Sequence, residues 1–467
     1  MDAKSYDLVV IGGGPSGEKG AAQVAYFGKK VAIVEKEEFF GGAAANTGTI
    51  PAKTLRETSL VLSGFKARNL FGVDLSLGQE TNVEKFLHQE RAVKERERER
   101  IQANLDRHRV DTFRGAGSFV DANTVAVEHP GKPTVHLRGE KFLICTGSSP
   151  RRPAEYPFGD KRVYESDSIL HLTEMPKKMV VIGGGVIGVE YACTFAALGT
   201  DVSIVDRHEV LLGFLDKEIS LALMDRMRKD GIEIVTDGVD SCEAKPNVIH
   251  LNLKSGKQLS MDGLLVCAGR TSNIEGLNLE GVGVETGDRG LIKKNEFFQT
   301  SVPHIYAVGD VIGFPALAST SMEQARVAMV HAFNLEYKKG VASVLPFGIY
   351  SIPEVSMAGE TEEALKEKGI PYVVGRARYG DNPRGMIIGD YDGFLKLLYH
   401  RDDMSLLGVH VIGEIATEIV HIGLMALMTD AHSDLFIRAC YNYPTLGDLY
   451  KYATYDAMGA RQKALKS

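Results

Sequence analysis

The sequence predicts an α/β protein in which one strand–helix–strand unit occurs twice. Residues 6–36 and 179–207 each run from an apolar strand through a glycine turn into an amphipathic helix, and each closes with an apolar strand that ends in an acid. Fifty glycines among 467 residues fit the many tight strand-to-helix turns of this class. Because the chain is too long for one hydrophobic core, we expect about three domains.

The first unit has the glycine spacing of a dinucleotide-binding turn. Gly12 permits the tight turn, Gly14 lets a pyrophosphate approach the backbone, and Gly17 lets the helix pack closely on the strand. The unpaired N–H groups and partial positive charge at the start of the helix favour phosphate there. Glu35 closes the second strand, where a carboxylate accepts hydrogen bonds from an adenosine ribose.

The second unit repeats the pattern with Gly183, Gly185, Gly188 and Asp206. Two such units in one chain indicate hydride transfer between FAD and a nicotinamide nucleotide. Asp206 suits the ribose 2′-hydroxyl of NAD(H), whereas Arg207 next to it could attract the 2′-phosphate of NADP(H). The sequence therefore favours NAD(H), with NADP(H) as the alternative.

Residues 300–313, TSVPHIYAVGDVIG, form a short apolar strand that ends in Gly309 and Asp310. This segment resembles the flavin-binding segment of flavoproteins with two dinucleotide domains, in which the aspartate contacts the ribityl chain. The resemblance implies FAD at the first unit and NAD(P) at the second. The turns that contain Gly147 and Gly269 are similar to those at which the chain of such proteins passes between the two domains.

Together these motifs resemble the pyridine nucleotide-disulfide oxidoreductase family, which includes dihydrolipoamide dehydrogenase and glutathione reductase. The resemblance extends over essentially the whole chain. It implies an FAD-binding domain made of residues 1–150 and 275–345 and a NAD(P)-binding domain over 151–274. Residues 346–467 would form an α+β dimerisation domain, so the expected partners are nicotinamide nucleotides and a second copy of the chain.

Net charge, apolar segments and cysteine spacing each limit the partners and the location that we expect. A net charge of -7 and a pI near 6.0 give no electrostatic reason to bind nucleic acid. No segment approaches the roughly 20 apolar residues that span a bilayer, and no signal peptide precedes the first strand, so we expect a cytoplasmic protein without membrane insertion.

The five cysteines lie far apart and form no metal-ligand cluster, and we expect inert, mostly buried thiols and no metal site.

One charge run interrupts this pattern. Residues 94–108 alternate basic and acidic side chains, which predicts a long helix with a solvated face and no further function.

Residues 41–53, GGAAANTGTIPAK, have the frame of the family's redox-active loop but contain no cysteine. Ala44 and Thr49 stand where disulfide reductases of the family have their cysteines, and Tyr443 stands where they have a histidine base. A tyrosine hydroxyl of ordinary pKa near 10 is a poor base at neutral pH.

Gly42 and Lys53 of that loop are retained, as is Glu190 on the second helix. The resemblance implies that Lys53 and Glu190 form an ion pair beside flavin N5. Lys53 would then stabilise the anionic reduced flavin, and Glu190 would orient Lys53.

Without a disulfide, electrons that reach the flavin must leave to a second nucleotide or to an outside acceptor. GTIPAK and NYPT, residues 48–53 and 442–445, resemble the nucleotide transhydrogenases of the family. We therefore expect an FAD-dependent NAD(P) transhydrogenase with ping-pong hydride transfer through flavin N5, although Ala44 departs from the single cysteine typical of that group. The alternatives are an NAD(P)H:quinone or other acceptor oxidoreductase and a non-catalytic flavin-binding protein.

Overall fold

The computed structural model describes residues 3–64 and 82–466. The chain divides into two compact units, which are described one at a time. The first unit comprises residues 1–54, 87–151 and 268–341, and the second comprises residues 55–86, 152–267 and 342–467.

The first unit is built on a seven-stranded sheet in the order β3-β2-β1-β6-β5-β4, with β17 paired to β6. Strands β1, β2, β3, β6 and β17 pair in parallel, whereas β4 and β5 form antiparallel pairs. The strands are β1 (Lys4–Ile11), β2 (Val31–Glu35), β3 (Asp111–Arg114), β4 (Ala116–Asp121), β5 (Thr124–Glu128), β6 (Val135–Ile144) and β17 (Ile305–Ala307).

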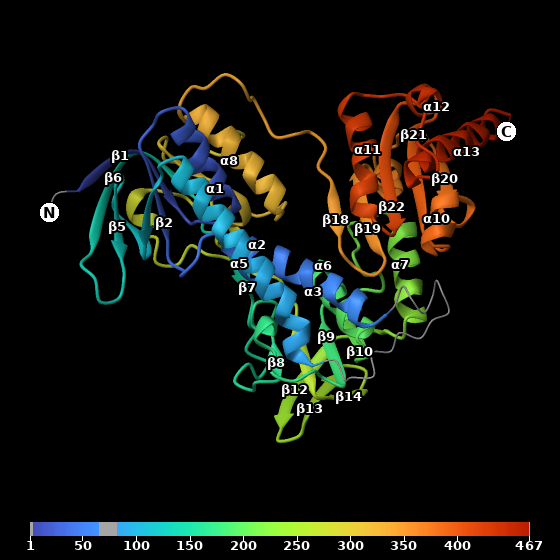
Figure 1. Ribbon diagram of the computed structural model, residues 1–467, viewed down its shortest axis with the longest axis horizontal. Helices are drawn as coiled ribbons and strands as arrows, with labels where there is room; N and C mark the ends of the chain where they lie inside the picture. Colours follow the sequence, from blue (N-terminus) through green and yellow to red (C-terminus); the bar gives the residue numbers. More distant parts are fainter. Residues whose placement is uncertain (1–2, 65–81, 467) are drawn as a thin grey trace. The chain divides into compact units, whose positions relative to one another are not determined.

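Helices α1 (Pro15–Tyr26) and α8 (Ala318–Ala332) lie side by side against this sheet (Figure 1). The close packing of α1 on β6 favours Gly20, because a Cβ there would lie 2.6 Å from Leu143 Cδ2. All five residues of β2 are buried, as expected for a parallel strand covered on both faces. The helices that follow β2 are α2 (Gly42–Asn46), α3 (Thr49–Leu62) and α5 (Val83–Arg107).

A small antiparallel pair completes the first unit. Strand β7 (Ser148–Pro150) pairs with β16 (Arg270–Ser272), so that two segments about 120 residues apart in sequence meet. Strand β7 follows β6 in the chain, shortly after Cys145.

The second unit contains a parallel sheet of five strands in the order β11-β10-β9-β15-β8. Helix α6 (Val186–Ala197) follows β9, and helix α7 (Lys217–Lys229) follows β10. A separate antiparallel sheet has the order β12-β13-β14. These strands are β8 (Val163–Tyr164), β9 (Lys178–Ile182), β10 (Asp201–Asp206), β11 (Glu233–Thr236), β12 (Val239–Lys245), β13 (Val248–Leu253), β14 (Gln258–Met261) and β15 (Gly263–Val266).

The last part of the second unit is an antiparallel sheet in the order β18-β19-β22-β21-β20, with helices packed on it (Figure 1). Tyr450 of α13 is fully buried and joins this helix to α11, because its hydroxyl accepts from Gly423 N (3.0 Å) and donates to Ile419 O (2.8 Å). The strands are β18 (Phe347–Ile349), β19 (Glu354–Gly359), β20 (Tyr372–Arg378), β21 (Phe394–His400) and β22 (Leu406–Gly413). The helices are α9 (Glu362–Glu367), α10 (Pro383–Ile388), α11 (Ala416–Met428), α12 (Asp434–Arg438) and α13 (Leu449–Ala464).

This architecture confirms the predicted fold class of two parallel α/β sheets and a C-terminal α+β part. The two units do not follow the predicted domain boundaries, which stay a prediction. Within residues 3–64 and 82–466, none of the helices combines the length and the hydropathy that crossing a bilayer requires.

The prediction of mostly buried cysteines holds only in part. Cys145 and Cys193 are buried, Cys242 and Cys267 are half-buried, and Cys440 is exposed. Burial raises the pKa of the Cys145, Cys193 and Cys267 thiols to about 12, so these three are unreactive near neutral pH.

Candidate functional site

The glycine turn between β1 and α1 is closed by backbone contacts. Gly12 has a φ of +106° and donates its N–H to Val34 O (2.8 Å). A Cβ at Gly12 would overlap the carbonyl oxygen of Cys145, and a Cβ at Gly17 would overlap the carbonyl oxygen of Gly12. Only glycine fits either place.

Gly14, in contrast, faces open space. It is the N-cap residue of α1 with an extended backbone, and the nearest atom to a Cβ there would be Gly42 Cα at 3.8 Å. The free N–H groups at the start of α1 therefore border a cradle that no side chain fills, which fits a dinucleotide pyrophosphate.

Glu35 stands at the end of β2, beside this turn. Its carboxylate accepts hydrogen bonds from Gly13 N (2.8 Å) and Glu37 N (2.9 Å). Burial raises the pKa of the Glu35 carboxyl above its ordinary value, although both N–H groups favour the charged form. A hollow of about 480 Å³ opens next to it, lined by Lys36, Glu37, Glu38, Arg114, Gly115, Ala116, Glu128, His129 and Pro130.

Asp310 belongs to a hydrogen-bonded network that the sequence alone did not reveal. The Ser148 hydroxyl donates to Asp310 Oδ2 (2.6 Å), and Arg270 donates from Nε to Ser148 Oγ (2.7 Å) and from Nη2 to Ser148 O (2.6 Å). Arg270 Nε also lies 4.0 Å from Asp310 Oδ2. The antiparallel pairing of β7 with β16 brings Ser148 and Arg270 together, and Asp310 lies just after β17, which pairs with β6.

The glycines near this network are turn residues. Gly147, Gly269 and Gly309 all have a positive φ, of +68°, +90° and +78°. Gly309 donates its N–H to the buried side chain of Gln324 (2.8 Å), and Gly147 accepts from Asn273 N (3.0 Å). Sequence reasoning singled out these turns but missed the side chains of Ser148, Arg270 and Gln324.

The second glycine turn repeats the first in its contacts. Gly183 has a φ of +101°, and a Cβ there would lie 2.5 Å from Cys267 O. A Cβ at Gly188 would overlap Gly183 O, whereas a Cβ at Gly185 would have no atom within 4 Å. The start of α6 therefore also borders an unfilled cradle that fits a pyrophosphate.

Asp206 holds the position in this unit that Glu35 holds in the first. It accepts from Gly184 N (2.6 Å), His208 N (2.8 Å) and His208 Nδ1 (2.7 Å). Burial disfavours the charged form, but these donors together hold the pKa of the Asp206 carboxyl below its ordinary value. Arg207 and His208 are exposed at the end of β10, where a ribose substituent would lie.

The cysteine-free segment packs against the first glycine turn. Gly41 donates its N–H to Gly13 O (2.7 Å), and a Cβ at Gly42 would lie 2.8 Å from Gly14 Cα. Ala44 lies on α2, and Thr49 begins α3. Because these residues are an alanine and a threonine, neither position offers a thiol.

Lys53 lies on α3 within the first unit, and Glu190 lies on α6 within the second. Glu190 is buried and accepts from Tyr350 N (2.9 Å). Their ion pair stays a prediction. Tyr443 is 78% exposed, and a short 3-10 helix (Leu446–Asp448) leads from its segment into α13.

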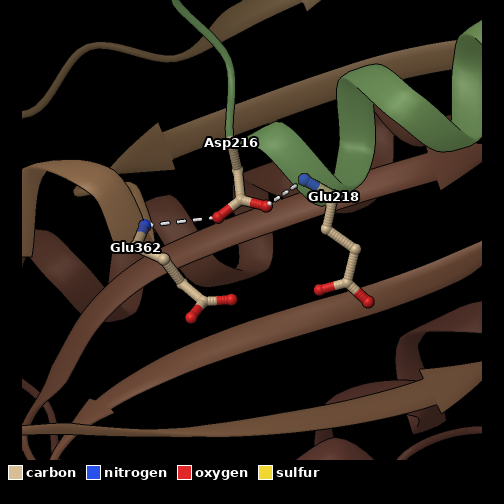
Figure 2. Close-up of side chains that lie close together, drawn as sticks. All are labelled: Asp216, Glu218 and Glu362. Atoms are coloured by element: carbon tan, nitrogen blue, oxygen red, sulfur yellow. Dashed lines mark hydrogen bonds between the residues drawn. The ribbon is translucent and has the colours of Figure 1, made fainter.

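Three carboxylates of the second unit, those of Asp216, Glu218 and Glu362, come close enough together to suggest a cation site (Figure 2). Asp216 also accepts from Glu218 N (3.1 Å) and Glu362 N (3.2 Å), and so caps α7 and the start of α9. The Nζ atom of the fully buried Lys396 lies between them, at 2.7, 2.9 and 2.6 Å from Asp216, Glu218 and Glu362. An ammonium group therefore occupies the place that a metal cation would take, and we assign no metal to these residues.

Comparisons with known proteins agree with this geometry. A family model described as "Pyridine nucleotide-disulphide oxidoreductase" matches residues 6–332, and one described as its dimerisation domain matches residues 345–454. The chain is 44% identical to the soluble pyridine nucleotide transhydrogenase of Mycobacterium bovis (strain BCG / Pasteur 1173P2), over 97% of each chain. It is 40% identical to the protein of that name from Pseudomonas putida (strain GB-1), over 98% of this chain and 99% of the relative.

Among solved structures, the chain is similar to the HOCl-induced flavoprotein disulfide reductase RclA from Escherichia coli. The TM-score is 0.87 at 24% identity, covering 96% of this chain and 99% of that one. This likeness shows a common fold.

Proposed function

The chain belongs to the pyridine nucleotide-disulphide oxidoreductase family, and from this premise we propose that it is an FAD-dependent soluble NAD(P) transhydrogenase. The observation that carries the proposal is the combination of two complete dinucleotide turns with a loop, Gly41–Lys53, that holds no cysteine. Near full-length similarity to relatives with that name supports it.

Bound FAD would supply the group that takes hydride from one nicotinamide nucleotide and returns it to the next. The residues of this chain hold and orient the two nucleotides. For FAD we propose Gly12, Gly14, Gly17, Glu35, Gly42, Lys53, Gly147, Gly309 and Asp310, and for NAD(P) we propose Gly183, Gly185, Gly188, Asp206, Arg207 and Gly269.

Lys53 and Glu190 are the proposed catalytic pair. A lysine ammonium near the flavin would stabilise negative charge that develops on its ring, which is an electrostatic role that needs no proton transfer. Glu190 is buried, and its carboxylate is already oriented by the backbone of Tyr350, which suits a group that must hold a lysine in place.

A transhydrogenase must accept both NAD(H) and NADP(H). The low pKa of Asp206 keeps a carboxylate ready for a ribose 2′-hydroxyl, and we propose that the exposed Arg207, next in the chain, binds a 2′-phosphate. We also propose a homodimer, because a dimerisation domain occupies residues 345–454.

Nucleotide exchange under anaerobic conditions tests the function. Purified protein with FAD is mixed with NADPH and thio-NAD, and thio-NADH formation is followed beside the reduction of an added quinone. Transhydrogenation predicts rapid thio-NADH formation. If the reduced flavin passes its electrons to the quinone but not to NAD or thio-NAD, the protein is an acceptor oxidoreductase and the proposal fails. Rapid oxidation of dihydrolipoamide would equally contradict it.

A further inference from the structure

The charged helix α5 reaches the cysteine-free segment through Arg98. Arg98 donates from Nε to Asn46 Oδ1 (2.8 Å), and its guanidinium carbon lies 3.7 Å from the centre of the Phe39 ring. Only 20% of the side chain is exposed. Arg98 thus makes a charge-assisted hydrogen bond to this segment and a cation–π contact to Phe39, which comes just before it in the chain.

Asn46 connects Arg98 to the backbone of the loop through hydrogen bonds. Its side-chain amide donates to Phe40 O (3.1 Å) and to Gly42 O (3.0 Å), while its oxygen accepts from Arg98. Asn46 is the last residue of α2, so these bonds fix both the start and the end of this five-residue helix.

The loop also packs against the first glycine turn. A Cβ at Gly41 would lie 2.8 Å from Ile101 of α5, so the helix packs directly on the loop. Gly41 N donates to Gly13 O (2.7 Å), and Gly42 lies against Gly14. A shift of the loop would therefore move the turn at which the pyrophosphate binds.

No disulfide can hold this segment, because residues 41–53 contain no cysteine. We propose that Arg98, acting through Asn46, is a positioning residue that holds residues 41–46 in the conformation that binds FAD. The proposal rests on the proposed function in one respect, the presence of FAD at the first glycine turn. It gives one residue of the charge run a role beyond a solvated face.

The test uses full-length protein with Arg98→Met, Asn46→Ala and the double variant. Methionine keeps contact with the Phe39 ring but cannot donate to Asn46. Arg96→Met is the matched control, because Arg96 lies on the same helix and is exposed. Arg98→Lys tests rescue, since an ammonium group can still donate to Asn46. Three quantities are measured: amide hydrogen exchange of residues 41–46 without flavin, FAD affinity by fluorescence titration, and the rate of flavin reduction by NADPH.

Arg98→Met and Asn46→Ala should each speed exchange in residues 41–46 and weaken FAD binding about tenfold, the loss expected for one charge-assisted hydrogen bond. The double variant should be no worse than the worse single one, Arg98→Lys should recover part of the loss, and Arg96→Met should match the wild type. Wild-type exchange and FAD affinity in Arg98→Met, or additive effects in the double variant, would overturn the proposal. The exchange measurement needs no flavin and no transhydrogenation, so its outcome is separate from that of the proposed function.

Discussion

Gly14 and Gly185 hold the same place in the two glycine turns, and both leave room that a ligand would take. Their neighbours Gly17 and Gly188 are different, because a Cβ at either would overlap a carbonyl oxygen of the turn. The same motif therefore contains glycines needed for packing and glycines needed for ligand approach.

Gly185→Ala should leave the fold intact and weaken nucleotide binding. Gly185 has a φ of -79°, and no atom lies within 4 Å of the added Cβ, so the free protein has neither strain nor clash. The Cβ would occupy the space of the pyrophosphate, at a cost of about 1.4–2.8 kcal/mol, or roughly 10-fold to 100-fold in affinity. Calorimetry with NADH and NADPH measures this, with Gly159→Ala as a control in open space. A lower melting temperature with unchanged affinity would contradict the assignment.

Arg207→Ala should weaken the use of NADPH while leaving NADH binding nearly unchanged. Asp206 is engaged by Gly184 and His208 in either case, so binding of NADH should change little. Loss of the guanidinium should raise the KM for NADPH about tenfold, the effect of one charge-assisted contact to phosphate. Steady-state kinetics with both donors check this, and equal effects would remove Arg207 from the phosphate site.

At the scale of secondary-structure elements, Lys396 joins three of them. It lies on β21 and binds acids from the N-termini of α7 and α9, and it is fully buried. Burial disfavours the ammonium, but its hydrogen bonds to the three carboxylates raise the pKa of Lys396 above its ordinary value. The start of α7 therefore depends on a side chain that is distant in sequence.

Lys396→Met should destabilise the protein by about 3–5 kcal/mol, because it leaves the buried carboxylate of Asp216 without its cation. Urea unfolding followed by circular dichroism measures the loss. Lys368→Met serves as the control, since Lys368 pairs with Glu360 in an exposed position and should cost less than about 1 kcal/mol. Equal losses in the two variants would show that burial of the ion pair does not matter.

The same cluster predicts how stability depends on pH. Burial opposes the charged form of Glu218, but donors from Arg376 and Lys396 lower the pKa of its carboxyl to about 2, from 4.5. Because the folded-state pKa is depressed, the stabilisation is complete above about pH 4.5 and is lost as the pH falls towards 2. The stability difference between the wild type and Glu218→Gln should therefore shrink from pH 5 to pH 2. Glu367→Gln, at an exposed site, should give a difference that does not vary with pH.

At the scale of the whole molecule, the C-terminal part of the chain keeps apolar side chains at its surface. On α11, Met425 and Met428 are 55% and 49% exposed, three residues apart on one face of the helix. Tyr443 is also exposed. Such a surface within a dimerisation domain suits contact with a second copy.

Met428→Glu should shift the protein from dimer to monomer, because it places a charge in an apolar interface. Sedimentation velocity measures the change, with Val120→Glu on β4 as a control for an exposed apolar residue elsewhere. A Met428→Glu protein that stays dimeric would exclude this face of α11 from the interface.

Local patterns in the sequence identified both glycine turns, their closing acids, the segment around Asp310 and the loop without a redox disulfide. These features are local: a strand, a turn and a helix start within a few residues, and their side-chain types follow from backbone sterics and the charge at a helix end. The long helix predicted from the charge run is confirmed as part of α5.

Which distant side chains meet depends on how the elements pack, and no local pattern in the sequence shows this. Ser148 and Arg270 meet because two short strands pair across about 120 residues, and Ser148 donates to Asp310, which follows β17. Lys396 on β21 binds Asp216, which lies 180 residues earlier in the chain. Arg98 makes one of the predicted ion pairs along the helix, with Glu95, but it also donates to Asn46 on another helix, which the charge pattern did not predict. Periodicity shows which face of one element is polar, but packing of other elements against that face decides whether water or a buried partner receives its charge.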